Sequence, residues 1–325
     1  RSRSSAGRSA RILSTCVIIP AAGSGTRLGG AEPKAFVRVN GRSLLARSLD
    51  AINSSGVAST VVVGAPEEFL FRAREEIAAV TANTECRMSI TAVAGGNDRT
   101  ESVQIALKHV GDAEFVLVHD AARCLTPPEV FRRVLAAVRS GAAAVVPVLP
   151  MIDTVRRAVP ADSGSSRAGA SESARPLVQA SSGSRERLSG ALERADLRRV
   201  QTPQGFRTEV LLRAHEQHRR DPDAVSDEEA AAVGGAAPTD DAGLVERLGF
   251  DVVAVPGHEE ALKITYPLDL LLGEELARIR DEGTGAAPLT SDTGSPATDT
   301  GSPATGTDSP ATDTDSLTRD SGEQR

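Results

Sequence analysis

Aromatic residues are scarce in this sequence: Phe, Trp and Tyr together make up 2% of the 325 residues, and Trp is absent. Proteins that bind single-stranded nucleic acid stack bases on aromatic side chains, so the scarcity disfavours that class. The core must instead be built from Ala, Val, Leu and Ile. Such a core is typical of α/β layers, in which buried parallel strands appear as short aliphatic runs.

Cysteines are also few, and the three present, Cys16, Cys86 and Cys124, lie far apart. Their spacing matches no metal-binding pattern such as C-x-x-C, and an odd number argues against a disulfide framework. No apolar run approaches the roughly 18 residues of a membrane span. The Arg/Ser-rich start lacks the apolar stretch of a secretory signal. We therefore expect a protein of the reducing cytoplasm, without a membrane partner.

The net charge is −7, although both ends of the chain distort it. The stretch from Ser291 onward carries −5 and the opening segment carries four arginines, which leaves −6 on the body. A mildly acidic body binds DNA poorly, so no nucleic-acid partner is expected. A protein of this charge that handles phosphates needs a local cluster of basic groups.

Aliphatic runs and helix-like stretches alternate from about Ile12 to Pro160. The expected strands are 16–20, 60–64, 89–94, 115–120 and 142–149, and the expected helices are 43–53, 66–80, 99–110 and 127–139. Such alternation predicts an α/β fold with helices on both faces of a mostly parallel sheet. Ligands bind such sheets at the carboxyl ends of the strands.

The other segments define the expected domain organisation. Residues 1–11 predict a disordered basic leader, and residues 161–190, rich in Ser, Gly, Ala and Arg, predict a flexible insertion. Order resumes near Leu197 and continues to an amphipathic helix at 267–280. Residues 284–325 are acidic, repetitive and rich in Pro, which predicts a disordered tail. One folded domain is therefore expected over 12–283.

A Gly-rich loop, PAAGSGTRLG at 20–29, directly follows the first expected strand. Small residues let the backbone approach phosphates closely, and successive amides can bind phosphate oxygens. Arg27 and Lys34 would add positive charge for a triphosphate. Taken alone, Gly-x-Gly is equally compatible with an ordinary strand-to-helix turn, and it matches neither the dinucleotide fingerprint nor the P-loop.

Together with PKAF at 33–36, this loop resembles the signature of the 2-C-methyl-D-erythritol 4-phosphate cytidylyltransferases. The resemblance implies a Rossmann-like, nucleotide-diphospho-sugar transferase-like fold. It also implies transfer of CMP from CTP to a sugar-alcohol phosphate, with release of pyrophosphate, in the non-mevalonate isoprenoid pathway. It assigns Arg27 and Lys34 to the triphosphate as catalytic cations. The expected CTP-binding backbone in this loop is that of Ala21, Ala22, Gly23 and Gly25.

The sequence GGNDRTESV at 95–103 resembles the family's cytosine-recognition element, Gly-Gly-x-x-Arg-x-x-Ser-Val. The resemblance implies CTP contacts by Gly96, Asn97 and Ser102, and the family often has Asp where this chain has Asn97. Taken alone, the segment is also compatible with a helix N-terminus capped by Asn97 or Asp98.

The sequence HDAAR at 119–123 resembles a further family motif at the end of a strand. It implies that Asp120 helps to bind Mg²⁺, a metal that favours carboxylate and phosphate oxygens, and that Asp120 and Arg123 contact substrate. Without the resemblance, Asp120 could cap a helix, His119 could be a buried imidazole and Arg123 could form a salt bridge. The attacking phosphate oxygen is already anionic, so the reaction needs no strong base.

Three later elements resemble the family's acceptor-binding segments: TPQ at 202–204, TDDA at 239–242 and KIT at 263–265. They imply that Thr202, Thr239 and Thr265 bind the acceptor and that Lys263 is a third catalytic cation. By position, Arg194 corresponds to a family arginine that reaches across a homodimer from a small dimerisation arm. Ser226-Asp227-Glu228 is a competing alignment for the segment at Thr239.

Six such segments occur in family order across roughly residues 12–280. The resemblance favours methylerythritol phosphate as the acceptor, and a close alternative is ribitol 5-phosphate. An alternative of another class is a catalytically silent nucleotide-binding protein. Such a protein could lose Arg27, Lys34, Asp120 or Lys263, and this chain has all four.

Overall fold

The computed structural model describes residues 14–23, 25–28, 32–82, 85–160, 186–221 and 238–283. The expected leader at 1–11, the tail at 284–325, most of the expected insertion and the competing segment Ser226–Glu228 lie outside these described residues.

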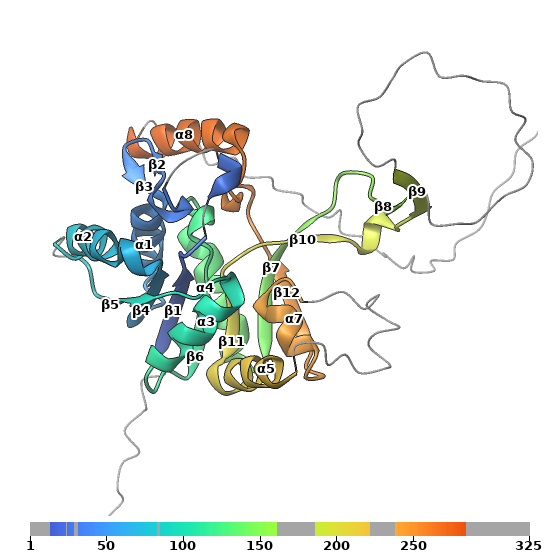
Figure 1. Cartoon of the computed structure of the whole chain (residues 1–325), viewed down its shortest axis with the longest axis horizontal. Coiled ribbons are helices and arrows are strands. Elements are labelled where there is room, and N and C mark those ends of the chain that lie inside the picture. Colours follow the sequence, from blue (N-terminus) through green and yellow to red (C-terminus); the bar gives the residue numbers. More distant parts are fainter. Residues whose placement is uncertain are drawn as a thin grey trace, which may run out of the picture. The chain divides into compact units, whose positions relative to one another are not determined.

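The fold is built on a mixed sheet of eight strands in the order β10-β7-β11-β6-β1-β4-β5, with β12 also paired to β7 (Figure 1). β1 lies inside the sheet, and its neighbours β6 and β4 run parallel to it, as does β5 beside β4. The strands are β1 (Thr15–Pro20), β4 (Thr60–Ala65), β5 (Ser89–Ala94), β6 (Phe115–Val118), β7 (Ala144–Pro150), β10 (Arg198–Val200), β11 (Gln204–Arg207) and β12 (Val252–Pro256).

Helices cover both faces of the sheet because the aliphatic strands present apolar side chains alternately to each side. In β1, Val17 and Ile19 belong to one core and Cys16 and Ile18 to the other. The first core includes side chains of α1 (Leu44–Ser55), α2 (Leu70–Thr81) and α4 (Pro128–Arg139). The second includes those of α3 (Arg99–Ala106), α5 (Thr208–Arg220) and α7 (Asp241–Glu246).

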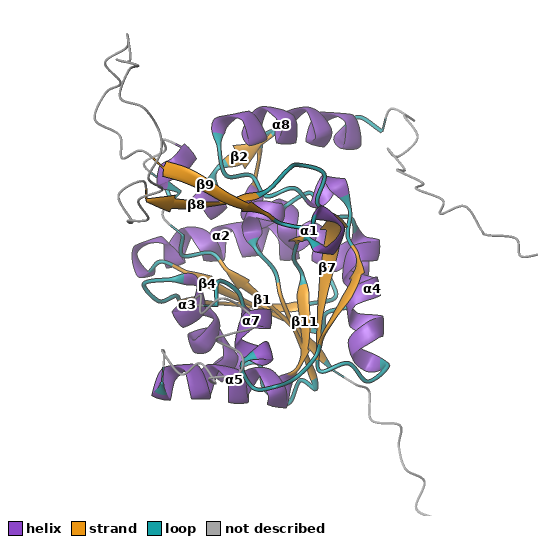
Figure 2. Cartoon of the chain, turned by 90° about the vertical axis from the view of Figure 1, so that its right-hand side faces the viewer, coloured by secondary structure: helices purple, strands orange, loops and turns teal. Residues whose placement is uncertain are grey.

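A third, smaller core lies under α8 (Pro267–Asp281), which packs beside the hairpin of β2 (Arg38–Val39) and β3 (Arg42–Ser43) (Figure 2). The hairpin turn has Asn40 and Gly41 at φ values of 44° and 77°. Consecutive positive φ values suit a type I′ turn, for which Asn-Gly is the preferred pair. Val39 of the hairpin, Ile264 and Ala277 fill this core.

Side-chain caps set the beginnings of three helices. The N-cap oxygens of Ser43, Asp98 and Asp240 accept hydrogen bonds from the backbone N–H groups of Ala46, Glu101 and Gly243. Such caps satisfy N–H groups that the first helical turn leaves unpaired. The caps at Asp98 and Asp240 fix the starts of α3 and α7.

The predicted α/β fold with a mostly parallel sheet is confirmed, with two differences. β10 and β11 run antiparallel to β7, so the sheet is mixed. In addition, residues 186–190, expected in the flexible insertion, belong to β9 (Glu186–Ala191), which pairs with β8 (Arg156–Pro160). This strand forms through its partner, because its own sequence has no clear apolar alternation.

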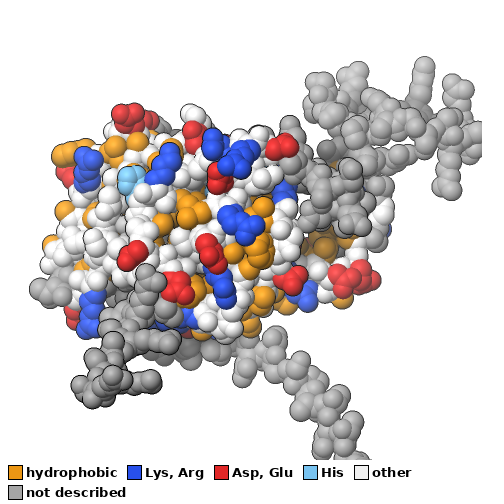
Figure 3. All heavy atoms as spheres, turned by 90° about the horizontal axis from the view of Figure 1, so that it is seen from below, with side chains coloured by type: hydrophobic (Ala, Val, Ile, Leu, Met, Phe, Trp, Pro, Cys, Tyr) orange, Lys and Arg blue, Asp and Glu red, His pale blue; other side chains and the backbone are white. Residues whose placement is uncertain are grey.

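Basic and acidic side chains are interspersed among the described residues of the face that Figure 3 shows. That face therefore presents no extended area of one charge sign. Of the described helices, none combines the length and apolar character that crossing a membrane requires.

Candidate functional site

A cavity of about 480 Å³ opens where β1, β5 and β6 end at their carboxyl edges. Its wall brings together four segments that are far apart in the sequence: the loop after β1, the start of α3, the turn after β6 and the segment before α8. The predicted site residues on its wall are Ala21, Ala22, Gly23, Gly25, Arg27, Lys34, Asn97, Ser102, Asp120, Lys263 and Thr265.

The loop after β1 folds back on Lys34. The N–H of Ala21 donates to the carbonyl of Gly64 (2.7 Å), and the N–H of Lys34 donates to the carbonyl of Gly23 (3.1 Å). Gly25 has a φ of 69°, and a Cβ there would lie 3.1 Å from the Lys34 nitrogen. A side chain at position 25 is therefore disfavoured both by its backbone conformation and by the space beside Lys34.

Gly25→Ala is expected to lower kcat/KM about tenfold for the nucleotidyl transfer that the sequence resemblance implies. A non-glycine residue with a left-handed backbone costs about 1–2 kcal/mol. Relief of that strain would displace Lys34. Steady-state kinetics with a thermal melt measure both effects. Gly41→Ala is the matched control: its φ is also positive, at 77°, but a Cβ there meets nothing within 4 Å. Equal losses of kcat/KM in the two variants would contradict a local role for Gly25.

Lys34 is half-buried, and its environment is electropositive. Burial, together with the charges of Lys263 and Arg27, lowers the pKa of Lys34 to about 8 from its ordinary 10.5. A cation held in this way is attracted strongly by a polyanion, because the anion removes the repulsion that lowers the pKa.

For CTP, the nucleotide that the sequence resemblance implies, we expect KM to rise between about pH 7 and about pH 9, because Lys34 of the unliganded protein loses its proton as the pH passes through its lowered pKa. The pH dependence of KM for CTP measures this. In Lys34→Arg the guanidinium stays protonated over that range, so this part of the pH dependence should disappear. Persistence of the same rise in Lys34→Arg would contradict the assignment.

The turn between β5 and α3 forms a second wall. The Ser102 hydroxyl accepts from the Gly96 N–H (3.0 Å) and donates to the Asp98 carbonyl (2.7 Å). The Asn97 side chain and N–H both donate to Glu101. Asp98 is the N-cap of α3, as one of the two sequence interpretations allowed, and Asn97 is left to face the cavity. The hydroxyl of Ser102 thus holds the turn in shape.

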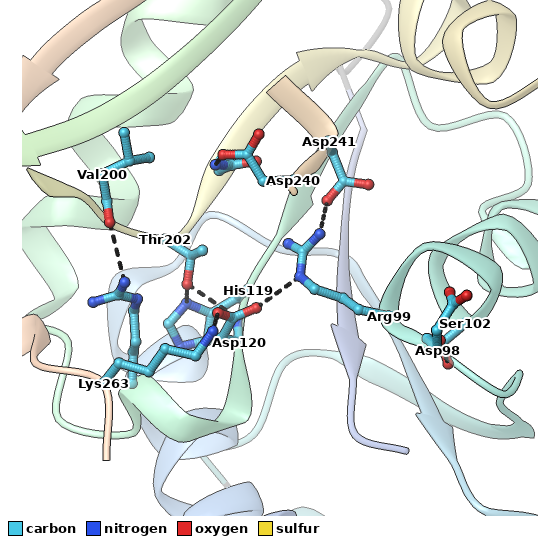
Figure 4. A network of polar contacts seen from close by, with 12 residues as sticks. Asp98, Arg99, Ser102, His119, Asp120, Val200, Thr202, Asp240, Asp241 and Lys263 are labelled. Atoms are coloured by element: carbon cyan, nitrogen blue, oxygen red, sulfur yellow. Dashed lines mark hydrogen bonds and ion pairs between the residues drawn. The ribbon is translucent and has the colours of Figure 1, made fainter. Parts of the chain in front are cut away.

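Asp120 is the centre of a network of charges (Figure 4). One carboxylate oxygen accepts from Arg99 (Nε···Oδ1, 3.1 Å), and the other pairs with Lys263 (Nζ···Oδ2, 2.8 Å). The backbone N–H of Asp120 donates to the hydroxyl of Thr202 (3.0 Å), which also lies 3.2 Å from His119 Nδ1. Asp120 is thereby held by three separate elements.

The charge states in this network follow from burial and pairing. Burial alone would raise the pKa of Asp120, but the charges of Arg99 and Lys263 outweigh it and hold that pKa well below its usual value. Burial lowers the pKa of the adjacent His119 to about 3, so its imidazole is neutral near pH 7. A neutral, fully buried imidazole fits the structural interpretation of His119.

Other predicted residues lie away from the cavity wall. Arg123 donates to the carbonyls of Ala261 (2.7 Å) and Val200 (3.1 Å) and so ties the turn after β6 to two neighbouring segments. Arg194 is exposed and donates to the Ile152 carbonyl (3.0 Å). Thr239 is exposed beside the N-cap of α7.

Three residues of this network, Arg99, Asp241 and His215, were missed in the sequence. Arg99 Nη1 lies 2.6 Å from Asp241 Oδ2, and His215 Nε2 lies 2.9 Å from Asp241 Oδ1. The signal for Arg99 was available, because it is the arginine of the Gly-Gly-x-x-Arg element. No signal marked His215, one of two histidines in an ordinary amphipathic helix.

Metal binding would depend on few protein ligands. Among the described residues no group of three or more His, Cys, Asp or Glu side chains is placed to hold an ion. Mg²⁺ is often bound by one or two carboxylates with substrate phosphates. Asp120 fits that donor set, because an ionised carboxylate has about four acceptor positions and two are used by Arg99 and Lys263.

Comparison with known proteins identifies the family. The sequence profile of the 2-C-methyl-D-erythritol 4-phosphate cytidylyltransferase family matches residues 15–167 and 178–278. Enzymes of that name from Rhodococcus opacus (strain B4) and Streptomyces avermitilis are each 42% identical, over 259 and 268 residues. The alignments cover 80% and 82% of this chain and 93% of each relative.

Solved structures agree with the sequence comparison. The 2-C-methyl-D-erythritol 4-phosphate cytidylyltransferase of Thermus thermophilus is 32% identical, with a TM-score of 0.56, and the match covers 82% of this chain and all of that one. A 4-diphosphocytidyl-2C-methyl-D-erythritol synthase from Anaerococcus prevotii, 22% identical, shares the fold with a TM-score of 0.59 over 82% of this chain and 98% of that one. The chain therefore belongs to the 2-C-methyl-D-erythritol 4-phosphate cytidylyltransferase family.

Proposed function

We propose that this nucleotidyltransferase transfers CMP from CTP to 2-C-methyl-D-erythritol 4-phosphate, giving 4-diphosphocytidyl-2-C-methyl-D-erythritol and pyrophosphate. The observation that carries the proposal is the meeting of Arg27, Lys34 and Lys263 on one cavity wall of a chain from this family. The sequence has three lysines, and two of them line this cavity.

The chemistry follows from that cluster of positive charge. A phosphate oxygen of the acceptor forms a bond to the α-phosphorus of CTP, while the bond from that phosphorus to the bridging oxygen breaks and pyrophosphate leaves with its electron pair. Negative charge accumulates on oxygens already bearing charge. Fixed cations stabilise such a transition state by electrostatics and positioning, without a covalent enzyme intermediate.

The residues have distinct proposed roles. Arg27 and Lys34 would bind the triphosphate, with the backbone from Ala21 to Gly25 and the turn of Gly96, Asn97 and Ser102 holding the nucleotide. Lys263, Thr265 and Asp120 would face the acceptor phosphate. Asp120 would also hold Mg²⁺, which when bound supplies further neutralisation of the triphosphate charge.

Predicted residues that do not line the cavity would support the site by holding other residues in place or by reaching it from another subunit. Thr202 holds the backbone of Asp120, and Arg123 holds the turn that follows it. We propose that Arg194, near the β8–β9 hairpin, completes the acceptor site of the partner in a homodimer, and that Thr239 contacts the acceptor when it binds. Sedimentation of the purified protein tests the dimer.

The three cysteines are unpaired, which supports action in a reducing cytoplasm.

Pyrophosphate release by the purified protein tests the activity. The assay contains CTP and Mg²⁺, with 2-C-methyl-D-erythritol 4-phosphate and ribitol 5-phosphate offered separately. Release with the first acceptor is expected. Release with ribitol 5-phosphate alone would overturn the acceptor but keep the chemistry, and folded protein that binds CTP without release in either case would indicate a silent nucleotide-binding protein.

A further inference from the structure

Arg99 is held between two carboxylates at the first position of α3. Its Nε lies 3.1 Å from Asp120 Oδ1 and its Nη1 lies 2.6 Å from Asp241 Oδ2 (Figure 4). The side chains of Asp120 and Asp241 are 11% and 1% exposed, and that of Arg99 is 24% exposed. A planar guanidinium can satisfy two carboxylates at once in a fixed geometry, which a lysine ammonium cannot reproduce.

The outer carboxylate, Asp241, is itself fixed by α5. Its second oxygen lies 2.9 Å from His215 Nε2, and the two side chains are 1% and 3% exposed. An ionised carboxylate only accepts hydrogen bonds, so His215 Nε2 carries the hydrogen that it donates to Asp241. Arg99, which itself lines the cavity, therefore cannot turn away from this pair without leaving Asp241 buried with His215 as its remaining partner, which is costly.

Lys263 contacts the same aspartate in a different way. Its Nζ lies 2.8 Å from Asp120 Oδ2, its side chain is 43% exposed, and it belongs to the segment between η7 (Glu259–Ala261) and α8. A lysine ammonium is a compact charge on a flexible stem and can change partners over a short distance. Of the two cations on Asp120, Lys263 is thus free to turn toward the cavity, whereas Arg99 is fixed.

We propose that Arg99 is a positioning residue, which holds and neutralises Asp120 so that Lys263 can leave Asp120 for an incoming phosphate oxygen. This inference rests on the proposed cytidylyl transfer. Without Arg99, Lys263 would remain the main counter-ion of Asp120, and the phosphate would meet a cation that is already engaged. We therefore expect the loss of Arg99 to change kcat more than the Kd for CTP.

The test compares Arg99→Met and Arg99→Lys with the wild-type protein. We measure kcat and both KM values by pyrophosphate release, and the Kd for CTP by calorimetry without acceptor. Arg99→Met should lower kcat about 10- to 100-fold, the loss expected for hydrogen bonds to a charged group. The Kd for CTP should stay within about threefold, because ground-state nucleotide binding is retained. The kcat of Arg99→Lys should be about tenfold higher than that of Arg99→Met. Lysine restores the positive charge but not the planar guanidinium that can bind two carboxylates at once.

Arg47→Met is the matched control for loss of a buried arginine. Its side chain is 6% exposed and pairs with Asp281 outside the cavity wall, at 2.6 Å. This variant should melt at a lower temperature but keep kcat. Arg99→Met/Asp241→Asn, which removes both charges, gives a folded test if the single variant is unstable, and the same loss of kcat is expected.

The outcomes separate the inference from the proposed function. Wild-type protein without turnover would overturn the proposed function and this inference with it. If the wild-type protein is active and either Arg99→Met or the double variant folds and keeps the wild-type kcat, the inference alone is overturned. If kcat fell equally in Arg99→Lys and in Arg99→Met, the positive charge that neutralises Asp120 would not be the contribution of Arg99, and the inference would be wrong.

Discussion

Lys34→Met should lower kcat about 10²- to 10³-fold, the loss typical of removing one preorganised transition-state contact. Lys34 lies on the wall of the cavity, its backbone N–H is fixed to the carbonyl of Gly23, and its ammonium faces repulsion from Lys263 and Arg27. A bound triphosphate would relieve that repulsion, and the growing charge in the transition state would relieve it further. Steady-state kinetics under saturating CTP measure kcat separately from binding.

Lys108→Met is the matched control, because Lys108 is the remaining lysine and lies exposed outside the cavity wall, in η4 (Leu107–His109). Its kcat and KM values should match those of the wild-type protein. The fold of Lys34→Met should be intact, since a half-buried cation surrounded by other cations contributes little to stability. A Lys34→Met enzyme with near-normal kcat would remove Lys34 from the catalytic machinery.

Asp120→Asn should lower kcat about 100-fold, because the carboxamide removes the negative charge that would bind Mg²⁺. Arg99 keeps its pairing with Asp241, so the variant should fold. A stability loss of about 1–3 kcal/mol is expected for replacing a charged acceptor with a neutral one. Kinetics at several Mg²⁺ concentrations and a denaturant melt measure the two effects separately.

Asp281→Asn is its matched control. Asp281 pairs with the buried Arg47 at 2.6 Å and does not line the cavity, so the change should affect stability while kcat is retained. If Asp120→Asn lost stability as Asp281→Asn does but kept kcat, Asp120 would be a structural partner of Arg99 and nothing more.

The central sheet was predictable because its strands carry a local signal. β1 and β4 are aliphatic runs buried on both faces, and each is followed by turn residues and a helix. β11 was not predictable as a strand, because Gln204–Arg207 has no aliphatic pattern and forms by pairing with β6 and β7. β9 likewise depends on β8, since its sequence includes Ser and Gly within the strand.

Much of the candidate site was predictable because each motif follows a strand at the same edge of the sheet. Arg27, Lys34, Asp120 and Lys263 are brought together for that reason. The network around Asp120 was not, because its contacts join distant parts of the chain. Arg99 and Asp241 are 142 residues apart in sequence, and nothing in either segment alone shows that they meet.

The functions of two hydroxyl groups also required the structure. The resemblance implies that Thr202 binds the acceptor, which stays a prediction; the structure adds that its hydroxyl accepts a hydrogen bond from the Asp120 N–H at 3.0 Å. The resemblance implies that Ser102 contacts CTP, which stays a prediction; the structure adds that its hydroxyl closes the turn at Gly96. A motif indicates which residues matter to a site, and the geometry adds the contacts that each of them makes within the protein.

The lowered pKa of Lys34 has a consequence for covalent chemistry. An amine with a pKa of about 8 is partly unprotonated in mildly alkaline buffer, and the unprotonated form is the nucleophile that acylating reagents and aldehydes attack. Such reagents should therefore modify Lys34 before the exposed Lys108, and a nucleotide in the cavity should shield it. The rate of labelling at this one amine, read by mass spectrometry, would report how fully the cavity is occupied.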